Sequence, residues 1–410
     1  MKLLFLLHFF KPESCAAAIR LNYFVDQVRN SGIDYEILAP KPNYPHGRVF
    51  PGFEGGIIHD KENYVTYLPI YLPQKPSVIG RFLSYFSYSL TALFYTLYKS
   101  KNFDVIISSS PPIFTAFTAA FLSKFKKKKF ILDLRDIWPD IGIELGILNN
   151  KDIIYWLKRM EKFIYNRADR IIVTADGDRK NLVEKGVQES KIELIFNGVD
   201  TAKFRPLSEE EKKLIRKDYK LPIDKKIAIY FGSLNQGMND IELLIDVILN
   251  SANKSEEIFY VVVGDGENKT EVLSKIGHLS NNLIIENLNH TELSRLVASS
   301  DISLVPRKDI RKDTGGNIPV KLFESLAAGV PVVLSTISGT EIEKIFTEIG
   351  VGRIVKSGDP EAFREAVESL ITDTESSNIG IKAGEYVKIN FDRINESKKF
   401  LNIIRDLKID

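Results

Sequence analysis

The stretch that most restricts how this chain can fold lies at residues 314–336. A polar loop leads into a short segment that can turn three apolar side chains toward a core: Leu322, Phe323 and Leu326. A Gly-Val-Pro sequence at 329–331 ends this segment, and an apolar run follows at 332–334. The order of loop, helix and strand predicts one step of an α/β domain built on a parallel sheet.

The start of this predicted helix suits an anion. Free backbone N–H groups and the positive end of the helix dipole favour a group such as a diphosphate. Lys321 adds a cation, and the Glu324 carboxylate can accept hydrogen bonds from a pair of hydroxyls such as a ribose diol. Diphosphate and diol together indicate a nucleotide. The competing interpretation is a solvated helix face, but the flanking glycines and the small residues at 327–329 let a ligand approach closely.

This stretch resembles the donor-binding signature of GT-B glycosyltransferases, in particular the retaining enzymes of family 4. Glu324, the Leu-Ala-Ala-Gly run at 326–329 and the Pro-Val-Val run at 331–333 match the second half of the family motif. The first half departs from it, because Gly316 stands where the family has a glutamate, eight residues before Glu324.

Three further segments are similar to the branch of family 4 that builds bacterial surface polysaccharides and O-antigens. They are Pro319-x-Lys321, the Pro-Asn-Tyr-Pro-x-Gly segment at 42–47 and the Arg-Asp-x-Trp-Pro block at 135–139. The Asn-Gly-Val-Asp turn at 197–200 is similar to the turn that joins the two domains in this family. The resemblance therefore extends over nearly the whole chain.

The resemblance implies an α/β protein of the GT-B fold, with two Rossmann-like doubly wound parallel-sheet domains facing a central cleft. We expect an acceptor-binding domain at 1–205, to which a C-terminal helix at about 390–410 packs back, and a nucleotide-sugar donor-binding domain at 206–389. A chain of 410 residues with 44% hydrophobic residues is long enough for two cores.

The expected donor contacts lie in the second domain. They are Gly232, Gly264, Arg307, Asn317, Pro319, Lys321 and Glu324. Most family 4 enzymes clamp the donor diphosphate with an Arg and a Lys from the loop after the first strand of this domain. Here Ser233 and Gln236 stand at those places, so we expect Lys321, with Arg307 or Lys308, to supply the positive charge.

The expected acceptor side lies at the carboxyl ends of the first domain's strands, where open parallel sheets bind ligands. Glu13 and Ser14, with Lys11, follow the first strand, and Ser14 is expected to cap the next helix. Arg135 and Asp136 follow a later strand, and Asp136 is the carboxylate expected near the acceptor hydroxyl. An Arg–Asp pair that only shapes the loop is the alternative. We expect Asp136, Arg135 and Glu324 to act in catalysis.

Residues 78–98 form the most unusual segment, because no charge lies between Arg81 and Lys99. Helical spacing gives it one apolar face, made of Ile79, Phe82, Leu83, Phe86, Leu90, Leu93, Phe94 and Leu97. This face either packs on the first sheet or lies in a membrane interface. The lysine cluster Lys124–Lys129 could attract anionic lipid and favours the membrane surface as a partner.

The remaining sequence features restrict where the protein is located and which class of protein it is. The first ten residues lack a convincing cleavage site, and we interpret them as a buried strand. The single cysteine, Cys15, excludes an internal disulfide and suits a reducing cytosol. A net charge of +2 gives no reason to expect nucleic acid. We expect a cytoplasmic protein, peripheral on the inner face of the cell membrane.

The expected function is transfer of a hexosyl or N-acetylhexosaminyl group from a nucleotide diphosphate sugar, with UDP preferred. The resemblance implies a saccharide acceptor on a polyprenyl diphosphate carrier, retention at the anomeric carbon, and neither a cofactor nor a metal ion at the diphosphate. A dehydrogenase is disfavoured because Lys269 replaces the third glycine of its fingerprint. A non-catalytic donor-binding or assembly subunit stays open, as does a nucleotide-sugar epimerase, which would have no use for a membrane-facing helix.

Overall fold

The computed structural model describes residues 1–410 except 46, 76, 101, 236, 253–256, 287, 309–317, 351, 374–375 and 408–410. It divides into a first unit, Met1–Phe196 with Ile394–Asp410, and a second unit, Asn197–Arg393. The boundary thus precedes the expected residue 205. Arg393 explains the difference, because its guanidinium donates to the carbonyl oxygens of Asn197 (3.1 Å) and Gly198 (2.8 Å) and ties this turn to the second unit.

The first unit contains an eight-stranded sheet in the order β3-β4-β2-β1-β5-β6-β7-β8, in which only the pairing of β3 with β4 is antiparallel. The strands are β1 (Lys2–Leu6), β2 (Asp34–Pro40), β3 (Ile58–Asp60), β4 (Val65–Leu68), β5 (Val105–Ser110), β6 (Lys129–Leu134), β7 (Arg170–Val173) and β8 (Ile192–Leu194). β1, with its apolar run, and β5, in which three apolar residues precede three serines, are buried on both faces. The chain reverses its direction across the sheet between β1 and β5.

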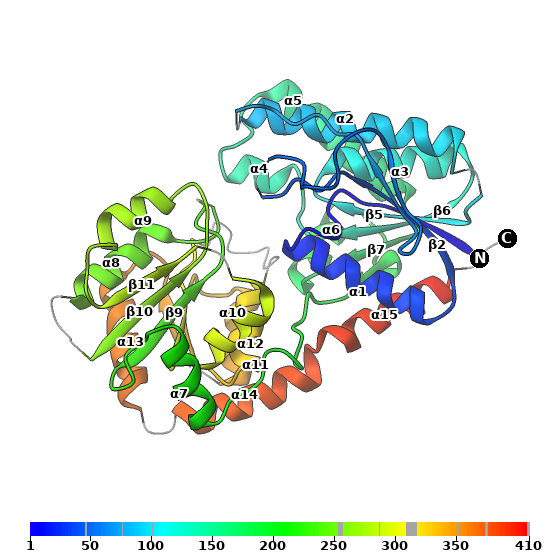
Figure 1. Ribbon diagram of the computed structural model, residues 1–410. Helices are drawn as coiled ribbons and strands as arrows, with labels where there is room; N and C mark the ends of the chain where they lie inside the picture. Colours follow the sequence, from blue (N-terminus) through cyan, green and yellow to red (C-terminus); the bar gives the residue numbers. More distant parts are fainter. Residues whose placement is uncertain are drawn as a thin grey trace. The chain divides into compact units, whose positions relative to one another are not determined.

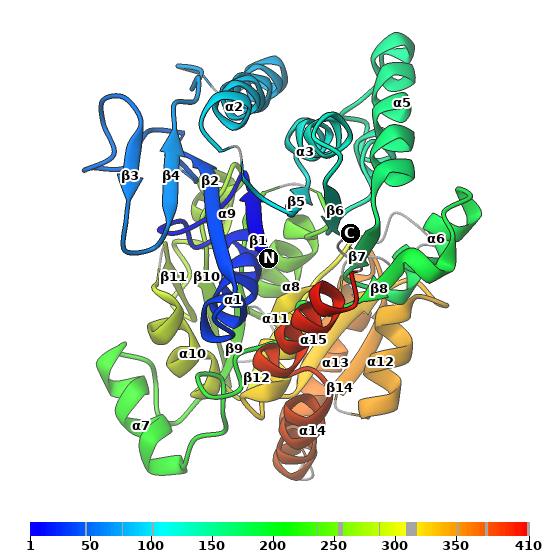
Figure 2. The ribbon, with the colours of Figure 1, turned by 90° about the vertical axis from the view of Figure 1, so that its right-hand side faces the viewer.

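Helices cover both faces of this sheet (Figures 1 and 2). On one face, α1 (Ala16–Asn30) and α15 (Arg393–Arg405) meet through stacked rings of Phe24 and Phe400, whose centroids are 4.4 Å apart. On the other face lie α2 (Val78–Tyr98), α3 (Ile113–Phe125) and α5 (Lys151–Arg167). Three short helices complete the unit: α4 (Asp140–Glu144), α6 (Asp176–Glu184) and the 3₁₀ turn η1 (Glu189–Lys191).

The second unit contains a fully parallel six-stranded sheet in the order β11-β10-β9-β12-β13-β14. The strands are β9 (Lys226–Phe231), β10 (Ile258–Val263), β11 (Asn282–Ile285), β12 (Ile302–Val305), β13 (Val332–Thr336) and β14 (Gly352–Lys356). The helices are α7 (Glu209–Asp218), α8 (Ile241–Ala252), α9 (Lys269–Ile276), α10 (His290–Ala298), α11 (Val320–Ala327), α12 (Glu341–Ile349), α13 (Pro360–Thr372) and α14 (Ser376–Asn390). The strand order reverses between β9 and β12, which is where doubly wound sheets bind ligands.

The C-terminal region contains two helices, α14 and α15. α14 ends at Asn390, two residues intervene, and α15 begins at Arg393. Phe391, in the break, stacks on Phe323 of α11 with ring centroids 4.4 Å apart, which holds the end of α14 to the second unit. α15 then packs on the first unit.

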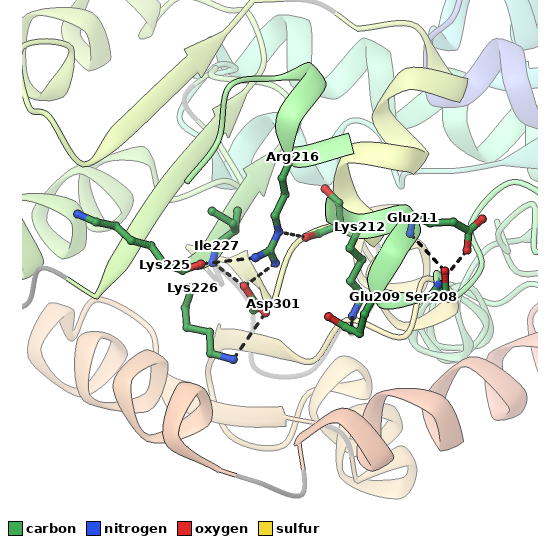
Figure 3. A network of polar contacts seen from close by, with 10 residues as sticks. Ser208, Glu209, Glu211, Lys212, Arg216, Lys225, Lys226, Ile227 and Asp301 are labelled. Carbon is green, nitrogen blue, oxygen red and sulfur yellow. Dashed lines mark hydrogen bonds and ion pairs between the residues drawn. The ribbon is translucent and has the colours of Figure 1, made fainter. Parts of the chain in front are cut away.

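A polar network fixes the amino ends of β9 and β12 (Figure 3). Arg216 of α7 donates to Asp301 at 2.8 Å and to the Ser299 carbonyl oxygen at 2.9 Å, and the backbone N–H of Ile227 donates to Asp301 at 2.7 Å. A cavity of about 180 Å³ lies beside it, and its Lys226 also pairs with Asp301. These amino ends of the strands lie away from the carboxyl ends, where ligands bind. The charged groups of the network pair with one another, so we assign the network a structural role.

Candidate functional site

Two loops cross closely at the carboxyl end of the second sheet. A Cβ atom at Gly264 would lie 2.0 Å from the carbonyl oxygen of Gly232, and Gly232 has a φ of +136°. The N–H groups of both glycines are already bonded, to Ile285 and Val263 respectively. The two glycines that the sequence assigns to the donor therefore shape the site through their missing side chains rather than through free N–H groups.

The Lys321 side chain extends into the space above Gly232. Its Nζ lies 3.2 Å from the position a Gly232 Cβ would take, 4.3 Å from the centre of the Tyr230 ring, and donates to Asn239 Oδ1 at 2.9 Å. Burial, assisted by the charge of Arg307, lowers the pKa of Lys321 to about 7. An anion bound here would shift that pKa upward again.

The two other basic residues proposed for this site differ in their surroundings. The Arg307 side chain is buried beside Lys321, and its backbone N–H donates to Ser335 Oγ at 2.7 Å. Lys308 instead pairs with Glu242 at 2.9 Å and with Asp240 at 3.7 Å. Because the Lys308 ammonium already forms ion pairs with these two carboxylates, we do not propose it as a contact of the diphosphate.

Glu324 is buried on the same helix as Lys321, with 7% of its surface exposed. Its Oε1 lies 3.1 Å from Nε2 of His290, the first residue of α10, and the His290 ring packs edge-on against Phe204. His290 was not predicted as a site residue. The only sequence signal for it is its position directly after a polar turn that follows a strand.

The first turn of α11 offers backbone donors to a ligand. The helix is preceded by Pro319, which is its N-cap, and no side chain of the described residues caps it. An anion in front of this turn would meet free N–H groups. Three positions that entered the sequence interpretation, Gly316, Asn317 and Gln236, lie outside the described residues.

In the first unit, Glu13 joins the loops that follow β1 and β2. Its Oε1 accepts from the N–H groups of Asn43 (2.8 Å) and Tyr44 (2.9 Å), while its buried Oε2 has no hydrogen-bond partner among the described residues. Burial raises the pKa of Glu13. Ser14 is exposed, and the expected cap is wrong, because the N-cap of α1 is Cys15, whose side chain makes no capping bond.

His8 lies in an aromatic pocket that the sequence did not reveal. Rings of Phe9, Tyr85 and Tyr88 surround it, with centroids 4.7 to 5.4 Å from its own. Burial, followed by the charge of Arg135, lowers the pKa of His8 to about 3, so its ring is neutral at physiological pH. Within the described part of the chain, the His8 Nδ1 has no hydrogen-bond partner.

Arg135 and Asp136 follow β6 at the same edge of the sheet. Arg135 donates to Ser109 Oγ at 3.1 Å and to the Pro111 carbonyl oxygen at 2.7 Å, so it holds the loop after β5. Burial raises the pKa of Asp136, and the nearby Arg135 charge opposes that shift. The first sheet thus carries two carboxyl groups of raised pKa, Glu13 and Asp136, near its own switch point.

Two doubly wound parallel sheets, each with polar groups at its carboxyl edge, define a protein of two Rossmann-like domains. Residues 17–203 match the sequence model "Glycosyltransferase Family 4", and residues 211–386 match "Glycosyl transferases group 1". Both halves of the chain are thus similar to glycosyltransferase domains, and the fold is that of the GT-B glycosyltransferases.

Curated relatives extend the match over the chain. WcaI of Escherichia coli (strain K12), named for colanic acid biosynthesis, is 22% identical and covers 97% of this chain and 98% of its own length. WbjE of Pseudomonas aeruginosa, named as a glycosyltransferase, is 24% identical and covers 75% of this chain and 76% of its own length.

Solved structures show the same fold. HepE of Anabaena, in complex with UDP, aligns with a TM-score of 0.71 and 14% identity over 99% of this chain and 100% of its own. WaaG, a glycosyltransferase involved in lipopolysaccharide biosynthesis, aligns with a TM-score of 0.69 and 13% identity over 99% and 100% of the two chains.

Proposed function

We propose that the protein moves a hexosyl or N-acetylhexosaminyl group from a nucleoside diphosphate sugar to a saccharide on a lipid carrier. One observation carries the proposal. Lys321 and Glu324 lie on one helix at the switch point of the second sheet, where Lys321 contacts the ring of Tyr230 and Asn239. This combination of a cation and a buried carboxylate on one helix supports the binding of a diphosphate and a ribose diol.

The preferred donor carries uridine diphosphate. HepE, which shares the fold, was solved with UDP and with UDP-glucose. In this chain Lys321 would contact the diphosphate, and Glu324 would accept hydrogen bonds from the ribose hydroxyls. We propose that transfer needs no metal ion and no further cofactor.

The transfer breaks the bond between the anomeric carbon and the diphosphate oxygen and forms a new bond to the acceptor oxygen. Charge develops on the leaving diphosphate, where Lys321 stabilises it. The acceptor hydroxyl loses its proton, and Asp136, whose pKa burial raises, is the group we propose to take it. Arg135 positions the loop that holds Asp136. We propose that the anomeric configuration is retained.

The acceptor is proposed to be a saccharide on a polyprenyl diphosphate at the inner face of the cell membrane. The names of WcaI and WaaG refer to colanic acid and lipopolysaccharide, and both support a role in surface-polysaccharide assembly such as that of O-antigen. None of the described helices is long and apolar enough to cross a bilayer. We propose that the contact with the membrane is peripheral.

A radiolabelled transfer assay with UDP-sugars and a lipid extract tests this function. We expect label in the lipid fraction, no loss of it with EDTA, and loss of it in Glu324→Gln and Asp136→Asn. Ser233, at the place of a diphosphate-clamping residue in most family 4 enzymes, favours the non-catalytic donor-binding subunit as the second candidate. Retained UDP binding without transfer to any lipid acceptor would support that candidate, and conversion of free UDP-sugar would support an epimerase.

A further inference from the structure

The helix α2 turns its apolar face away from the sheet. Its exposed side chains are large and apolar: Val78, Ile79, Leu83, Phe86, Leu90, Phe94 and Tyr98. Its buried positions are mostly small or hydroxyl-bearing: Gly80, Ser84, Tyr88, Ser89, Ala92 and Thr96. Phe82, Leu93 and Leu97 pack partly on the core. Core burial, one of the two interpretations of this segment, therefore fails for most of the apolar face.

The two neighbouring helices extend this apolar surface. α3 lies between α2 and α5, because Phe114 of α3 contacts Phe82 and Phe86 of α2, and Phe117 of α3 contacts Phe163 of α5. Figures 1 and 2 show the three helices side by side on one face of the first sheet. Further exposed apolar residues on α3 and α5 are Phe121, Phe125, Ile153, Tyr155 and Trp156.

The charge of this layer is positive, although two of its basic side chains are paired, Lys158 with Asp140 at 3.4 Å and Arg167 with Asp169 at 3.3 Å. The three helices carry seven basic side chains and two acidic ones, and one of the acidic residues, Glu161, is buried against Lys185. In the lysine cluster, Lys124 and Lys127 are exposed, whereas Lys128 pairs with Asp104 and Lys129 with Asp169. Only part of the cluster is therefore available to a partner.

We propose that the outer face of α2, α3 and α5 docks flat on the surface of an anionic lipid bilayer. The exposed rings would lie at headgroup depth, where aromatic side chains are stable, and the basic residues would meet lipid phosphates. A monomeric soluble protein rarely exposes so many large apolar side chains on neighbouring helices. The inference deepens the proposed function, since it names the surface through which the enzyme would reach a lipid-linked acceptor.

The same helix connects this face to the candidate acceptor side. Tyr85 of α2 contacts the ring of His8 at 4.7 Å, and His8 lies next to the residues that follow β1. Within the first unit, the docking face and the His8 pocket are therefore separated by about one helix diameter, roughly 10 Å. A saccharide attached to a membrane carrier could reach the pocket without leaving the bilayer surface.

Vesicle sedimentation with the full chain tests the proposal. We expect binding to vesicles of phosphatidylglycerol and phosphatidylcholine, weaker binding to pure phosphatidylcholine, and a decrease in high salt. The triple variant Leu83→Ser, Phe86→Ser, Phe94→Ser should lower binding at least about tenfold. The matched control, Leu214→Ser, Ile381→Ser, Ile389→Ser, removes three exposed apolar residues from the second unit and should bind as the wild type does.

A spectroscopic readout locates the contact independently of activity. Trp156 is 63% exposed, so its fluorescence should shift to the blue on anionic vesicles and be quenched by brominated lipid, and Trp156→Phe should remove both effects. UDP-induced thermal stabilisation should be equal in all variants, which separates this inference from the proposed donor site. Equal loss of binding in both triple variants would overturn the proposal. A face that binds a second copy would also overturn it, and would appear as a wild-type dimer that the first triple variant dissociates.

Discussion

Glu324 Oε1 and His290 Nε2 lie 3.1 Å apart, although 34 residues separate them in the chain. Through this contact, the first turn of α10 holds the Glu324 carboxylate of α11 in place. Since the Glu324 carboxyl is buried, the orientation of its oxygens depends on this partner. We infer that His290 positions the group that would bind the ribose diol.

His290→Ala should raise the donor KM about tenfold with little change in kcat, because it removes a hydrogen bond that orients Glu324. His290→Gln keeps a hydrogen-bond donor at a similar place, so its KM for the nucleotide sugar should return close to the wild-type value. Steady-state kinetics over a range of donor concentrations measure the effect. A fall in kcat with an unchanged KM in both variants would contradict a positioning role.

Lys321→Met should weaken UDP binding by about 10- to 100-fold, because a charge-assisted contact with the diphosphate is lost. Lys321→Arg should not restore it, since the space between Tyr230 and Gly232 fits an ammonium rather than a guanidinium. Lys308→Met is the matched control and should bind UDP normally, because Lys308 pairs with Glu242. Isothermal titration calorimetry compares the three variants.

The pH dependence of UDP binding follows from the lowered pKa of Lys321. In the free protein this group loses its proton as the pH rises through about 7, and a bound diphosphate favours the charged form. Affinity should therefore fall by roughly tenfold from about pH 7.5 to about pH 9, with proton uptake on binding. Calorimetry in buffers of different ionisation enthalpy measures the uptake. The Lys321→Met variant should show neither effect.

Gly264→Ala should destabilise the second unit by about 2–4 kcal/mol, because its Cβ would collide with the backbone of Gly232. Gly56→Ala meets no atom within 4 Å and should change the free energy of unfolding little. Urea denaturation, followed by circular dichroism, measures both. Equal stabilities would show that the two loops are not held as closely as the structure places them.

Much of the fold is predictable from local pattern. The segment 78–98 and the helix and strand within 314–336 have the expected types, because their apolar periodicity and flanking signals are strong. The short strands β3 and β14 are only half-buried, so they carry no hydrophobic pattern from which to predict them.

The site is predictable only where a motif marks it. Lys321 and Glu324 belong to one helix and one motif, whereas His290 and His8 join the candidate sites through contacts between distant parts of the chain. The buried ion pair between Arg20 of α1 and Asp133 of β6, whose charged atoms are 3.0 Å apart, likewise joins distant parts of the chain. For α2 the sequence shows two different faces, but which one meets the sheet depends on the small residues that pack closely there.

The most direct test of the central claim is a thermal-shift comparison of UDP, GDP, dTDP and ADP with the wild type, Glu324→Ala and the control Glu242→Ala. A ligand that binds only the native state raises its melting temperature. Glu242 is an exposed carboxylate of α8 and makes a matched control. We predict stabilisation by UDP in the wild type and the control, and its loss in Glu324→Ala. Equal stabilisation of all three proteins, or none by any nucleotide, would contradict a donor site on α11.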